Sequence, residues 1–351
     1  MKNTTIYDVA RDAGLSIKTV SRVMNGDATV KAANRNRILA AAEALGYRPN
    51  LSARSLAGAR SFVIAAFLDA ELTMDHWRGG RNSDYVSRLQ LGAMSECRAA
   101  GYHFTLELID HDPDKLRREV RDVLMALRPD GILLTPPSCD NPHVLELLEA
   151  AQVRYARLGS DVPISGGLQL HLGDRSGAAD VARHLIELGH RRIAIVTGPA
   201  EQSSSAERLE GFRQELTAMG LPLDDQLVRV GDYTFASGLE ATTSLMRLDA
   251  PPTAIFASND EMALGCLTAI DELGLSCPGD ISIAGFDDSG GARFSRPPLT
   301  TVRQPLVEMT ALAVRRLIDD VAYMQAPMVE DGVCSLVPGN STGPIIREWR
   351  A

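Results

Sequence analysis

Three short amphipathic segments predict a small helical head at the N-terminal end of the chain. Thr5 and Asp8 have the spacing of a capping box, and the apolar residues that follow lie on one helical face. Ser16 is placed to cap a second helix, and an alanine-rich third helix is expected over residues 32–45. Residues 47–58 are polar and punctuated by proline and glycine, which is typical of a linker that can form one or two helical turns.

From residue 62 onward, short apolar runs alternate with amphipathic stretches of helical period. Buried strands that alternate with helices indicate βαβ units and parallel sheets. The runs outnumber the strands of one mononucleotide-type sheet, so we expect an α/β core of two Rossmann-like lobes. The expected strands cover residues 62–68, 104–109, 131–134, 155–158, 193–196, 254–257 and 281–284.

The distribution of charge separates the head from the core. The whole chain has a net charge of −9, with 45% hydrophobic and 23% charged residues, as in an ordinary globular protein. Residues 1–60 hold ten Lys and Arg against four Asp and Glu, a net charge of +6, which leaves −15 for the rest of the chain. This asymmetry suggests a head that faces phosphates, although a solvated helical face would give the same count.

Several classes of protein lack their usual sequence signals in this chain. The five cysteines form no CxxC pair and the seven histidines no HxxxH pair, so neither a disulfide framework nor a metal site is expected. No apolar run reaches membrane-spanning length, and the N-terminal residues lack the apolar core of a signal peptide. Neither GxGxxG nor GxxxxGK[ST] occurs. We therefore expect a cytoplasmic protein that needs no cofactor.

Polar residues follow the expected strands, where parallel sheets bind their ligands. Many of them carry carboxylates or amides, which bind hydroxyl-bearing ligands through oriented hydrogen bonds. The sequence therefore predicts a ligand crevice beyond the strand ends. The residues in question are Asp69, Asp110, Thr135, Ser160, Asp161, Thr197, Gly198, Ser258, Asn259, Asp260, Asp287 and Asp288.

Three strings resemble catalytic or metal-binding motifs but lack the context that these motifs need. Residues 339–343 match GxSxG, yet the chain end follows instead of a helix. Residues 288–291 resemble a serine-protease nucleophile loop, but nothing else in the chain indicates paired β-barrels. Residues 110–114 begin like a calcium loop, but Lys115 stands where the sharp-turn glycine belongs, and helix capping by Asp112 explains the run better. We expect no catalytic residues and no enzymatic activity.

Residues 5–25, TIYDVARDAGLSIKTVSRVMN, resemble the head of the lactose/galactose-repressor (LacI/GalR) family. The shared pattern D-V-A-x-x-A-G-x-S-x-x-T-V-S-R-V-x-N is long and almost unbroken. Further similarity covers essentially the whole chain, at residues 46–50, 53–57, 185–194, 198–199, 208–212, 258–265, 285–288 and 298–302.

The resemblance implies a helix-turn-helix head whose second helix enters the major groove of DNA. Lys18 and Arg22 would then donate to guanine, and Ile17 would touch a thymine methyl group. The family's apolar wedge, which kinks the duplex from the minor groove, falls on Leu56. Contacts that fix the register of the head on DNA are expected from side chains with hydroxyl or amide donors, at Thr5, Tyr7, Ser16, Thr19, Ser21 and Asn25.

In the core, the resemblance assigns effector contacts to eight residues: Asp69, Tyr85, Ser204, Arg208, Tyr233, Asn259, Asp287 and Gln304. Asn259 and Asp287 also belong to the strand-end positions identified independently. Arg208 has the alternative role of capping or salt-bridging a helix. Tyr85 and Tyr233 suit the apolar face of a sugar ring, but either one could be part of the core instead.

The chain departs from the family pattern at four places. Lys31 and the two alanines after it replace the usual capping serine and acidic first turn of the third helix. Residues 338–340 stand where members often carry an arginine. The stretch over residues 72–83 is longer than the family's usual loop. The proline and aromatic residue common before Tyr85 are replaced by Ser83 and Asp84, which leaves the effector class open.

The family organisation divides the chain into a DNA-binding head (1–48), a hinge (49–60) and an effector-binding core of periplasmic-binding-protein type (61–344). We expect an N-lobe of residues 61–161 with 305–323. The remaining core residues, 162–304 with 324–344, are expected to form the C-lobe.

The resemblance implies a sequence-specific transcriptional regulator, a repressor whose affinity for DNA is controlled by a sugar or glycoside. Such a protein would be a homodimer on a pseudo-palindromic operator in double-stranded DNA, without contact to a membrane. A purine or nucleoside is the alternative effector. The rival functions are a sugar-binding receptor without DNA activity and an enzyme on the same scaffold. The basic head and the missing signal peptide oppose the first, and the lack of a complete catalytic set opposes the second.

Overall fold

The structure is a computed structural model that describes residues 4–24, 29–47, 60–78, 84–160, 162, 166–200, 202–326 and 329–345. The chain divides into two compact units, residues 1–62 with 127–129 and the remainder of the chain. The expected hinge, residues 49–60, lies outside the described residues except for Arg60.

The head consists of three helices, as the sequence predicts. The Thr5 amide donates to Asp8 Oδ2 at 3.0 Å, and both hydrogen bonds of the capping box are present. Buried Val9, Val20 and Ile38 belong to a single apolar core, which is how helices this short become stable. The helices are α1 (Ile6–Ala13), α2 (Ile17–Met24) and α3 (Ala32–Ala44).

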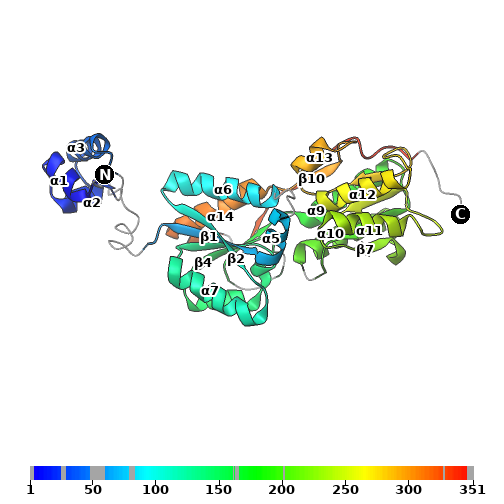
Figure 1. Cartoon of the computed structure of the whole chain (residues 1–351), viewed down its shortest axis with the longest axis horizontal. Helices are drawn as coiled ribbons and strands as arrows, with labels where there is room; N and C mark the ends of the chain where they lie inside the picture. Colours follow the sequence, from blue (N-terminus) through cyan, green and yellow to red (C-terminus); the bar gives the residue numbers. More distant parts are fainter. Residues whose placement is uncertain are drawn as a thin grey trace. The chain divides into compact units, whose positions relative to one another are not determined.

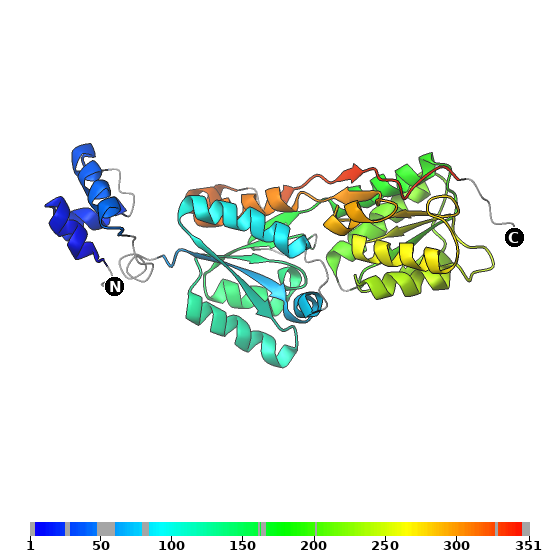
Figure 2. The same cartoon turned by 45° about the horizontal axis from the view of Figure 1, so that its top comes forward.

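The N-lobe is built on a six-stranded parallel sheet with the order β11-β5-β4-β3-β1-β2 (Figure 1). Alternate residues of its strands face opposite sides, and Phe67 and Leu134 pack with α7 (Pro113–Leu127) and α8 (Pro142–Ala150) into one core. Helices α6 (Asp84–Ala100) and α14 (Leu306–Ile318) lie on the other side (Figure 2). The strands are β1 (Val63–Asp69), β2 (His103–Ile109), β3 (Gly131–Leu134), β4 (Arg154–Leu158), β5 (Leu168–His171) and β11 (Val329–Asp331).

The N-lobe helices pack closely where small residues allow it. A Cβ atom at Gly92 would lie 2.4 Å from the carbonyl oxygen of Val307, so glycine lets α6 approach α14. The helical elements are α5 (Ala70–Arg78), α6 (Asp84–Ala100), α7 (Pro113–Leu127), the 3-10 turn η1 (Ser138–Asp140), α8 (Pro142–Ala150), α14 (Leu306–Ile318) and α15 (Asp320–Gln325).

The C-lobe is a four-stranded parallel sheet with the order β7-β6-β8-β9, covered by helices on both faces. On β8, Phe256 packs with α9 and α10, whereas its neighbour Ile255 packs with α11 and α12. The strands are β6 (Ile193–Thr197), β7 (Val228–Val230), β8 (Ala254–Ala257) and β9 (Ser282–Ala284). The helical elements are α9 (Asp174–Glu187), α10 (Ser203–Ala218), η2 (Asp225–Leu227), α11 (Phe235–Leu245), α12 (Asp260–Glu272) and α13 (Gly290–Phe294).

The expected lobe boundaries are corrected by the pairing of two short strands. β5 pairs in parallel with β4, so the N-lobe sheet continues past the boundary expected after residue 161. β11 pairs in parallel with β5, so residues 329–331 belong to this sheet and not to the C-lobe. The last strand, β12 (Ser335–Val337), pairs antiparallel with β10 (Thr301–Arg303). These strands have three or four residues each, too few to show a period in the sequence.

Three further expectations concern local structure. Residues 70–78, which include much of the stretch expected to be an extended loop, form helix α5 directly after β1. In the GxSxG-like string, Ser341 is buried, and its hydroxyl donates to the carbonyl oxygen of Ile283 at 2.6 Å. This serine therefore ties the C-terminal segment to β9. In the calcium-loop-like string, Asp110 forms an ion pair with Lys115 at 2.6 Å, and Asp112 caps α7.

Candidate functional site

The exposed face of α2 presents the side chains expected to read bases. Ile17 is 41% exposed, and Lys18 and Arg22 are exposed as well. Arg22 also contacts the Thr29 hydroxyl, which orients its guanidinium group on the head surface. The buried face of α2 carries Val20 and Val23, and packing of these two residues fixes which side of the helix faces outward.

The residues expected to contact phosphates lie around the first two helices. Tyr7 is 62% exposed, and Thr5 and Ser16 are also exposed. The Ser16 hydroxyl accepts a hydrogen bond from the Thr19 amide at 3.2 Å, so Ser16 caps α2 as the sequence predicts. Thr19 and Ser21 are half-buried. The two remaining predicted DNA contacts, Asn25 and Leu56, lie outside the described residues.

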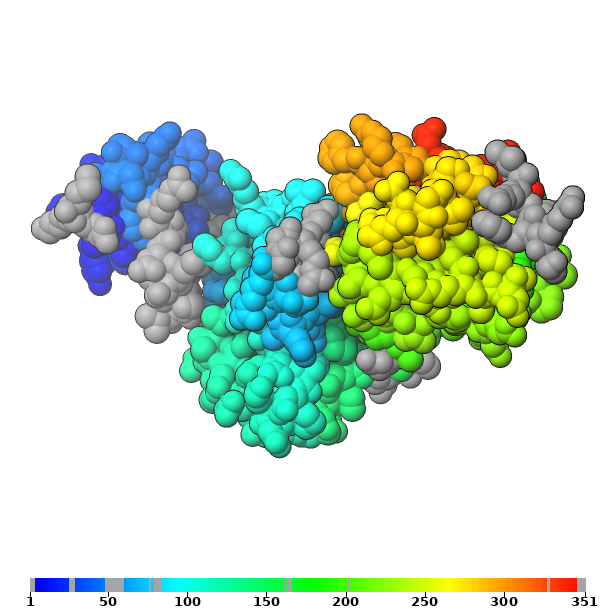
Figure 3. All heavy atoms as spheres, turned by 45° about the vertical axis from the view of Figure 1, so that its right-hand side comes forward, coloured from blue at the N-terminus to red at the C-terminus, as the bar shows by residue number. Residues whose placement is uncertain are grey.

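All eight residues assigned to the effector line one cavity of about 210 Å³ in the core. They come from both lobes, which lie against each other in Figure 3, where most of the N-lobe runs from light blue to teal and most of the C-lobe from green to yellow. Asp69 and Tyr85 belong to the N-lobe, and Arg208, Asn259 and Asp287 to the C-lobe. Each lies at or just beyond a strand end or in an adjacent helix, so the crevice lies where strand-end reasoning predicts it.

Arg208 lines the cavity and also forms a salt bridge, which was the alternative to an effector contact. Its Nε lies 2.7 Å from Asp174 Oδ1, and the two side chains are only 7% and 0% exposed. The guanidinium group also stacks on Phe286, with 4.0 Å between Cζ and the ring centroid, and donates to the carbonyl oxygen of Ser258. Burial lowers the pKa of Arg208, but Asp174, Tyr233 and Asp287 together more than offset this effect, so the net pKa is raised and the group stays charged.

Asn259 and Tyr233 support each other at the C-lobe side of the cavity. The Asn259 side-chain amide donates to the carbonyl oxygen of Tyr233 at 3.0 Å, while its oxygen caps α12. The Tyr233 hydroxyl lies 3.3 Å from that of Ser204. Gly198 is required beneath this ring, because a Cβ atom there would lie 2.1 Å from Tyr233 Cζ. Tyr233 is therefore held in place while lining the cavity.

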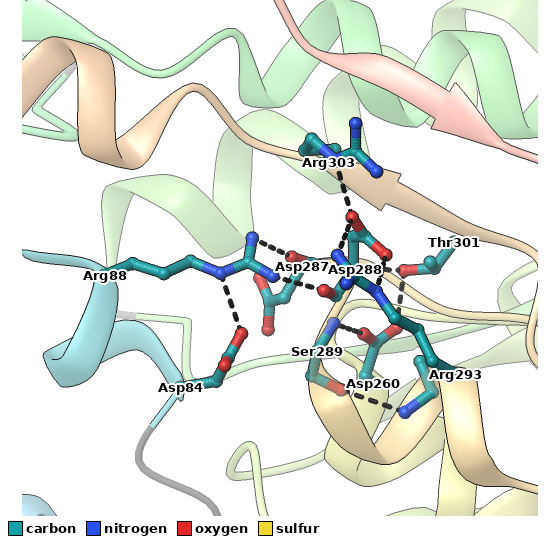
Figure 4. A network of polar contacts seen from close by, with 10 residues as sticks. Asp84, Arg88, Asp260, Asp287, Asp288, Ser289, Arg293, Thr301 and Arg303 are labelled. Carbon is teal, nitrogen blue, oxygen red and sulfur yellow. Dashed lines mark hydrogen bonds and ion pairs between the residues drawn. The ribbon is translucent and has the colours of Figure 1, made fainter. Parts of the chain in front are cut away.

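Asp287 offers the cavity a half-buried carboxylate that accepts no hydrogen bond within the described part of the chain. Burial raises the pKa of this group to about 8; Arg208 opposes the rise, and Asp260 and Asp174 add to it. Its backbone φ is +118°, which is rare for a residue with a side chain and costs about 1–3 kcal/mol. Such strain is found at functional sites, and Figure 4 shows the polar contacts that hold this loop.

The remaining predicted residues complete the N-lobe side and the floor of the cavity. Asp69 Oδ1 accepts a hydrogen bond from the Leu72 amide at 2.6 Å and so begins α5. The Tyr85 hydroxyl is buried without a hydrogen-bond partner among the described residues, and burial raises its pKa. The Gln304 side-chain amide donates to Asp174 Oδ1 at 3.2 Å.

Sequence reasoning missed several residues that line the same cavity. Trp77 and Thr73 reach it from α5, which was expected to be loop. Asp174 lines it from the first turn of α9, and Gln202 lies just before α10. The sequence LHLGD at residues 170–174 could have indicated Asp174. An aspartate that follows a strand and a glycine is typical of a turn from a strand into a helix.

Within the described ranges, no group of three or more His, Cys, Asp or Glu side chains is arranged to hold a metal ion. None of the helices in these ranges has the length and apolar character that a membrane span requires.

A ligand-binding core of two parallel-sheet lobes joined in one chain to a helix-turn-helix head defines a class of regulatory protein, and comparison with known families agrees. A model described as "Bacterial regulatory proteins, lacI family" matches residues 5–50. A model described as "Periplasmic binding protein-like domain" matches residues 182–342.

Curated relatives match over nearly their full length. Catabolite control protein A of Priestia megaterium is 34% identical over 337 residues, which are 95% of this chain and 96% of the relative. The ribose operon repressor of Escherichia coli (strain K12) is 33% identical over 315 residues, 90% of this chain and 92% of the relative. The chain belongs to the lacI family of bacterial regulatory proteins.

Solved structures with the same fold include two from regulators with bound ligands. The lac repressor dimer bound to operator and the anti-inducer ONPF has a TM-score of 0.78 and 30% identity, covering 97% of this chain and 100% of that one. The complex of the transcriptional regulator CelR with cellobiose has a TM-score of 0.72 and 29% identity, with the same coverage.

Proposed function

We propose that this protein is a sequence-specific DNA-binding repressor whose affinity for its operator is controlled by a sugar or glycoside. The observation that carries the proposal is the cavity of the core. Eight residues chosen from the sequence as effector contacts line this one space, although they are spread from Asp69 to Gln304. The relatives are transcriptional regulators, and we propose no catalytic activity for this chain.

The DNA-binding part of the proposal rests on the exposed face of α2. Lys18 and Arg22 lie one helical turn apart and are exposed, so both can donate to guanine O6 and N7 in a major groove. Ile17, exposed beside them, suits the methyl group of thymine. A two-fold dimer would present two such heads to a pseudo-palindromic operator. The lac repressor dimer bound to operator supports this arrangement.

The effector part rests on the chemistry of the cavity walls. The carboxylate of Asp287 and the side chains of Asn259 and Arg208 offer hydrogen-bond acceptors and donors to the hydroxyl groups of a sugar ring. Trp77, Tyr85 and Tyr233 add flat apolar surfaces that suit the faces of sugar rings. The CelR–cellobiose complex and the ribose operon repressor, both similar to this chain, support a saccharide effector.

The effector acts on DNA binding in this proposal through the closure of the two lobes. Residues from both lobes line the cavity, so a ligand that touches both favours one separation of the lobes over another. The change in operator affinity then equals the difference in ligand affinity between the two states.

A thermal-shift screen tests the effector assignment. Sugars, glycosides and nucleosides are added in turn, and a ligand that binds only the folded core raises its melting temperature. We expect at least one sugar or glycoside to do so, by less in the Asp287→Asn variant. If nucleosides raise the melting temperature and sugars do not, the saccharide assignment is wrong and the purine alternative replaces it.

A second measurement separates a regulator from a sugar-binding receptor. The intact chain is applied to a randomised DNA library, and bound sequences are selected and read. We expect a two-fold symmetric sequence to be enriched. Selection of no sequence by a folded chain that binds sugar would support the receptor reading.

A further inference from the structure

One arginine of the N-lobe is bound to the main chain of the C-lobe. Arg88 lies in α6, and its Nη1 donates to the carbonyl oxygen of Asp287 at 2.8 Å. Its Nη2 donates to the carbonyl oxygen of Asp288. Its Nε lies 2.8 Å from Asp84 Oδ2, one turn earlier in the same helix. All three guanidinium nitrogens are therefore engaged, two of them with the other lobe (Figure 4).

The loop that receives Arg88 is held rigidly from its own side. The Asp288 carboxylate is 1% exposed and accepts hydrogen bonds from Arg293 and Arg303. The Asp287 amide donates to the carbonyl oxygen of Val302 at 2.8 Å. Both aspartates have positive φ angles, +118° and +54°, so the direction of their carbonyl groups is set by an uncommon backbone conformation. Arg88 thus binds two carbonyl oxygens whose positions the C-lobe fixes.

A second network ties the same loop to helix α12. Asp260, the first residue of α12, accepts a hydrogen bond from the Ser289 amide at 2.7 Å and another from the Thr301 hydroxyl. Asp260 also lines the cavity. The loop over residues 287–289 is therefore connected to the cavity wall at both of its ends.

Asp287 faces two partners at once. Its side chain lines the effector cavity, while its carbonyl oxygen accepts the hydrogen bond from Arg88. A rotation of this residue that improves a contact to ligand would move the carbonyl group that Arg88 holds. Because the two groups belong to one residue with a constrained backbone, contact with ligand and contact between the lobes depend on each other.

We propose that Arg88 is a latch: it holds the N-lobe against the Asp287–Asp288 loop and positions Asp287 for the effector. Breaking the latch opens the two lobes and separates Asp287 from the N-lobe wall of the cavity. The consequence for the effector rests on the proposed function, whereas the latch itself is a property of the core that is measured without any ligand.

A simpler role for Arg88 would be to stabilise α6 through its i,i+4 pair with Asp84. Arg88→Lys distinguishes the two roles. Lysine keeps the charge opposite Asp84, but it lacks the fork of parallel donors that reaches two carbonyl oxygens together. The latch predicts that lysine behaves like glutamine at this position, whereas a helix-stabilising role predicts that it behaves like arginine.

The separation of the lobes is measured with two spin labels in the full chain. Labels are attached at Met125→Cys on α7, where the native side chain is 68% exposed, and at Met219→Cys after α10, where it is 52% exposed. Labelled chains are diluted into excess unlabelled chain, so that only distances within one protomer are read. The native cysteines compete poorly for the label, because burial raises the pKa of Cys97, Cys266, Cys277 and Cys334 to about 12.

The matched control is Arg315→Gln. Arg315 Nη1 lies 2.6 Å from Glu96 Oε1, so this pair also involves α6, but it joins α6 to α14 within the N-lobe. Losing it removes an ion pair from the same helix without touching the other lobe. Circular dichroism shows for every variant that the fold is retained.

Hydrogen bonds from a charged group are strong enough that losing them shifts the equilibrium between closed and open lobes markedly. We expect the ratio of long to short label separations to rise about tenfold or more in Arg88→Gln and in Arg88→Lys, and to stay unchanged in Arg315→Gln. A distance distribution in Arg88→Gln equal to that of the wild type would overturn the proposal. So would an equal effect of Arg315→Gln, or a wild-type distribution in Arg88→Lys. None of these results would contradict the proposed DNA-binding function, because the label distances report on the core alone.

Discussion

The ion pair between Arg208 and Asp174 allows a direct test of how the cavity is held together. Arg208→Met removes the charge but keeps much of the apolar bulk that packs against Phe286. The Asp174 side chain, 0% exposed, then loses its cationic partner and keeps only the Gln304 amide at 3.2 Å. Removing one member of a buried ion pair typically costs about 3–5 kcal/mol. We expect a loss of that size in the free energy of unfolding of the core.

The loss is measured by urea unfolding followed by far-ultraviolet circular dichroism, with the slope of the transition compared between variants. Arg175→Met is the matched control. Arg175 also pairs with a glutamate, Glu207, but it is 49% exposed, so its loss should cost less than about 1 kcal/mol. Adding Asp174→Asn to Arg208→Met should recover much of the loss, because the unpaired buried charge is gone. A cost below about 1 kcal/mol for Arg208→Met would refute the buried-charge reasoning.

Four further predictions concern DNA binding, pH and ligand charge. Operator affinity should fall with salt by about 0.9 log units per log unit for each neutralised phosphate, and a salt-independent complex would contradict the role of the basic head. Lys18→Ala should cost about 1–3 kcal/mol at one symmetric pair of base positions, whereas Ser21→Ala should weaken all sequences equally; selection on randomised DNA reads both. The pKa of Asp287, raised by burial to about 8, should fall when effector hydroxyls donate to the carboxylate, so effector affinity should rise as pH increases towards 8. Calorimetry at pH 7 in buffers of different ionisation enthalpy should show proton release with the wild type and none from this site with Asp287→Asn. The cavity lining holds one Arg and six Asp and Glu residues, of which Asp287 is mostly neutral at pH 7 because its pKa is about 8. A phosphorylated sugar should therefore bind at least about tenfold more weakly than its neutral parent in a thermal-shift titration, and equal binding would contradict this electrostatic reading.

Local physical chemistry determines those parts of the fold that the sequence predicts well. The capping box of Thr5 and Asp8 satisfies backbone amides within four residues, so it is visible in the sequence and present in the structure. The buried strands β3 and β8 are continuous apolar runs of four residues bounded by polar residues, and the sequence predicts them at their observed bounds.

The strand and the helix that the sequence does not predict depend on contacts that short sequence windows do not contain. β11 has three residues and is a strand only because it pairs with β5, about 160 positions earlier in the chain. Helix α5 begins directly after β1, where the Asp69 side chain caps the first turn, and no linker separates the two elements. Spacing within a short window carries no information about either of these arrangements.

The residues of the candidate site also divide into those that local sequence predicts and those that it does not. Asp287 and Asn259 follow strands, so strand-end reasoning alone reaches them. Arg208 lies inside α10, and only family resemblance pointed to it, because its partner Asp174 is 34 positions away. Nothing in the sequence indicates the contacts of Arg88, because its two carbonyl partners are 199 and 200 positions distant. Every residue has a main-chain carbonyl group, so such acceptors cannot be recognised from residue type.

The most direct test of the central claim is a titration of operator DNA with and without effector, once selection and screening have supplied both. The wild type should show an affinity change of about 5- to 150-fold on adding effector. Asp287→Ala should bind operator as the ligand-free wild type does and show no change, whereas Leu56→Ala should bind effector normally and lose operator affinity. If Asp287→Ala responds to effector as fully as the wild type, the cavity between the lobes is not the sensing site.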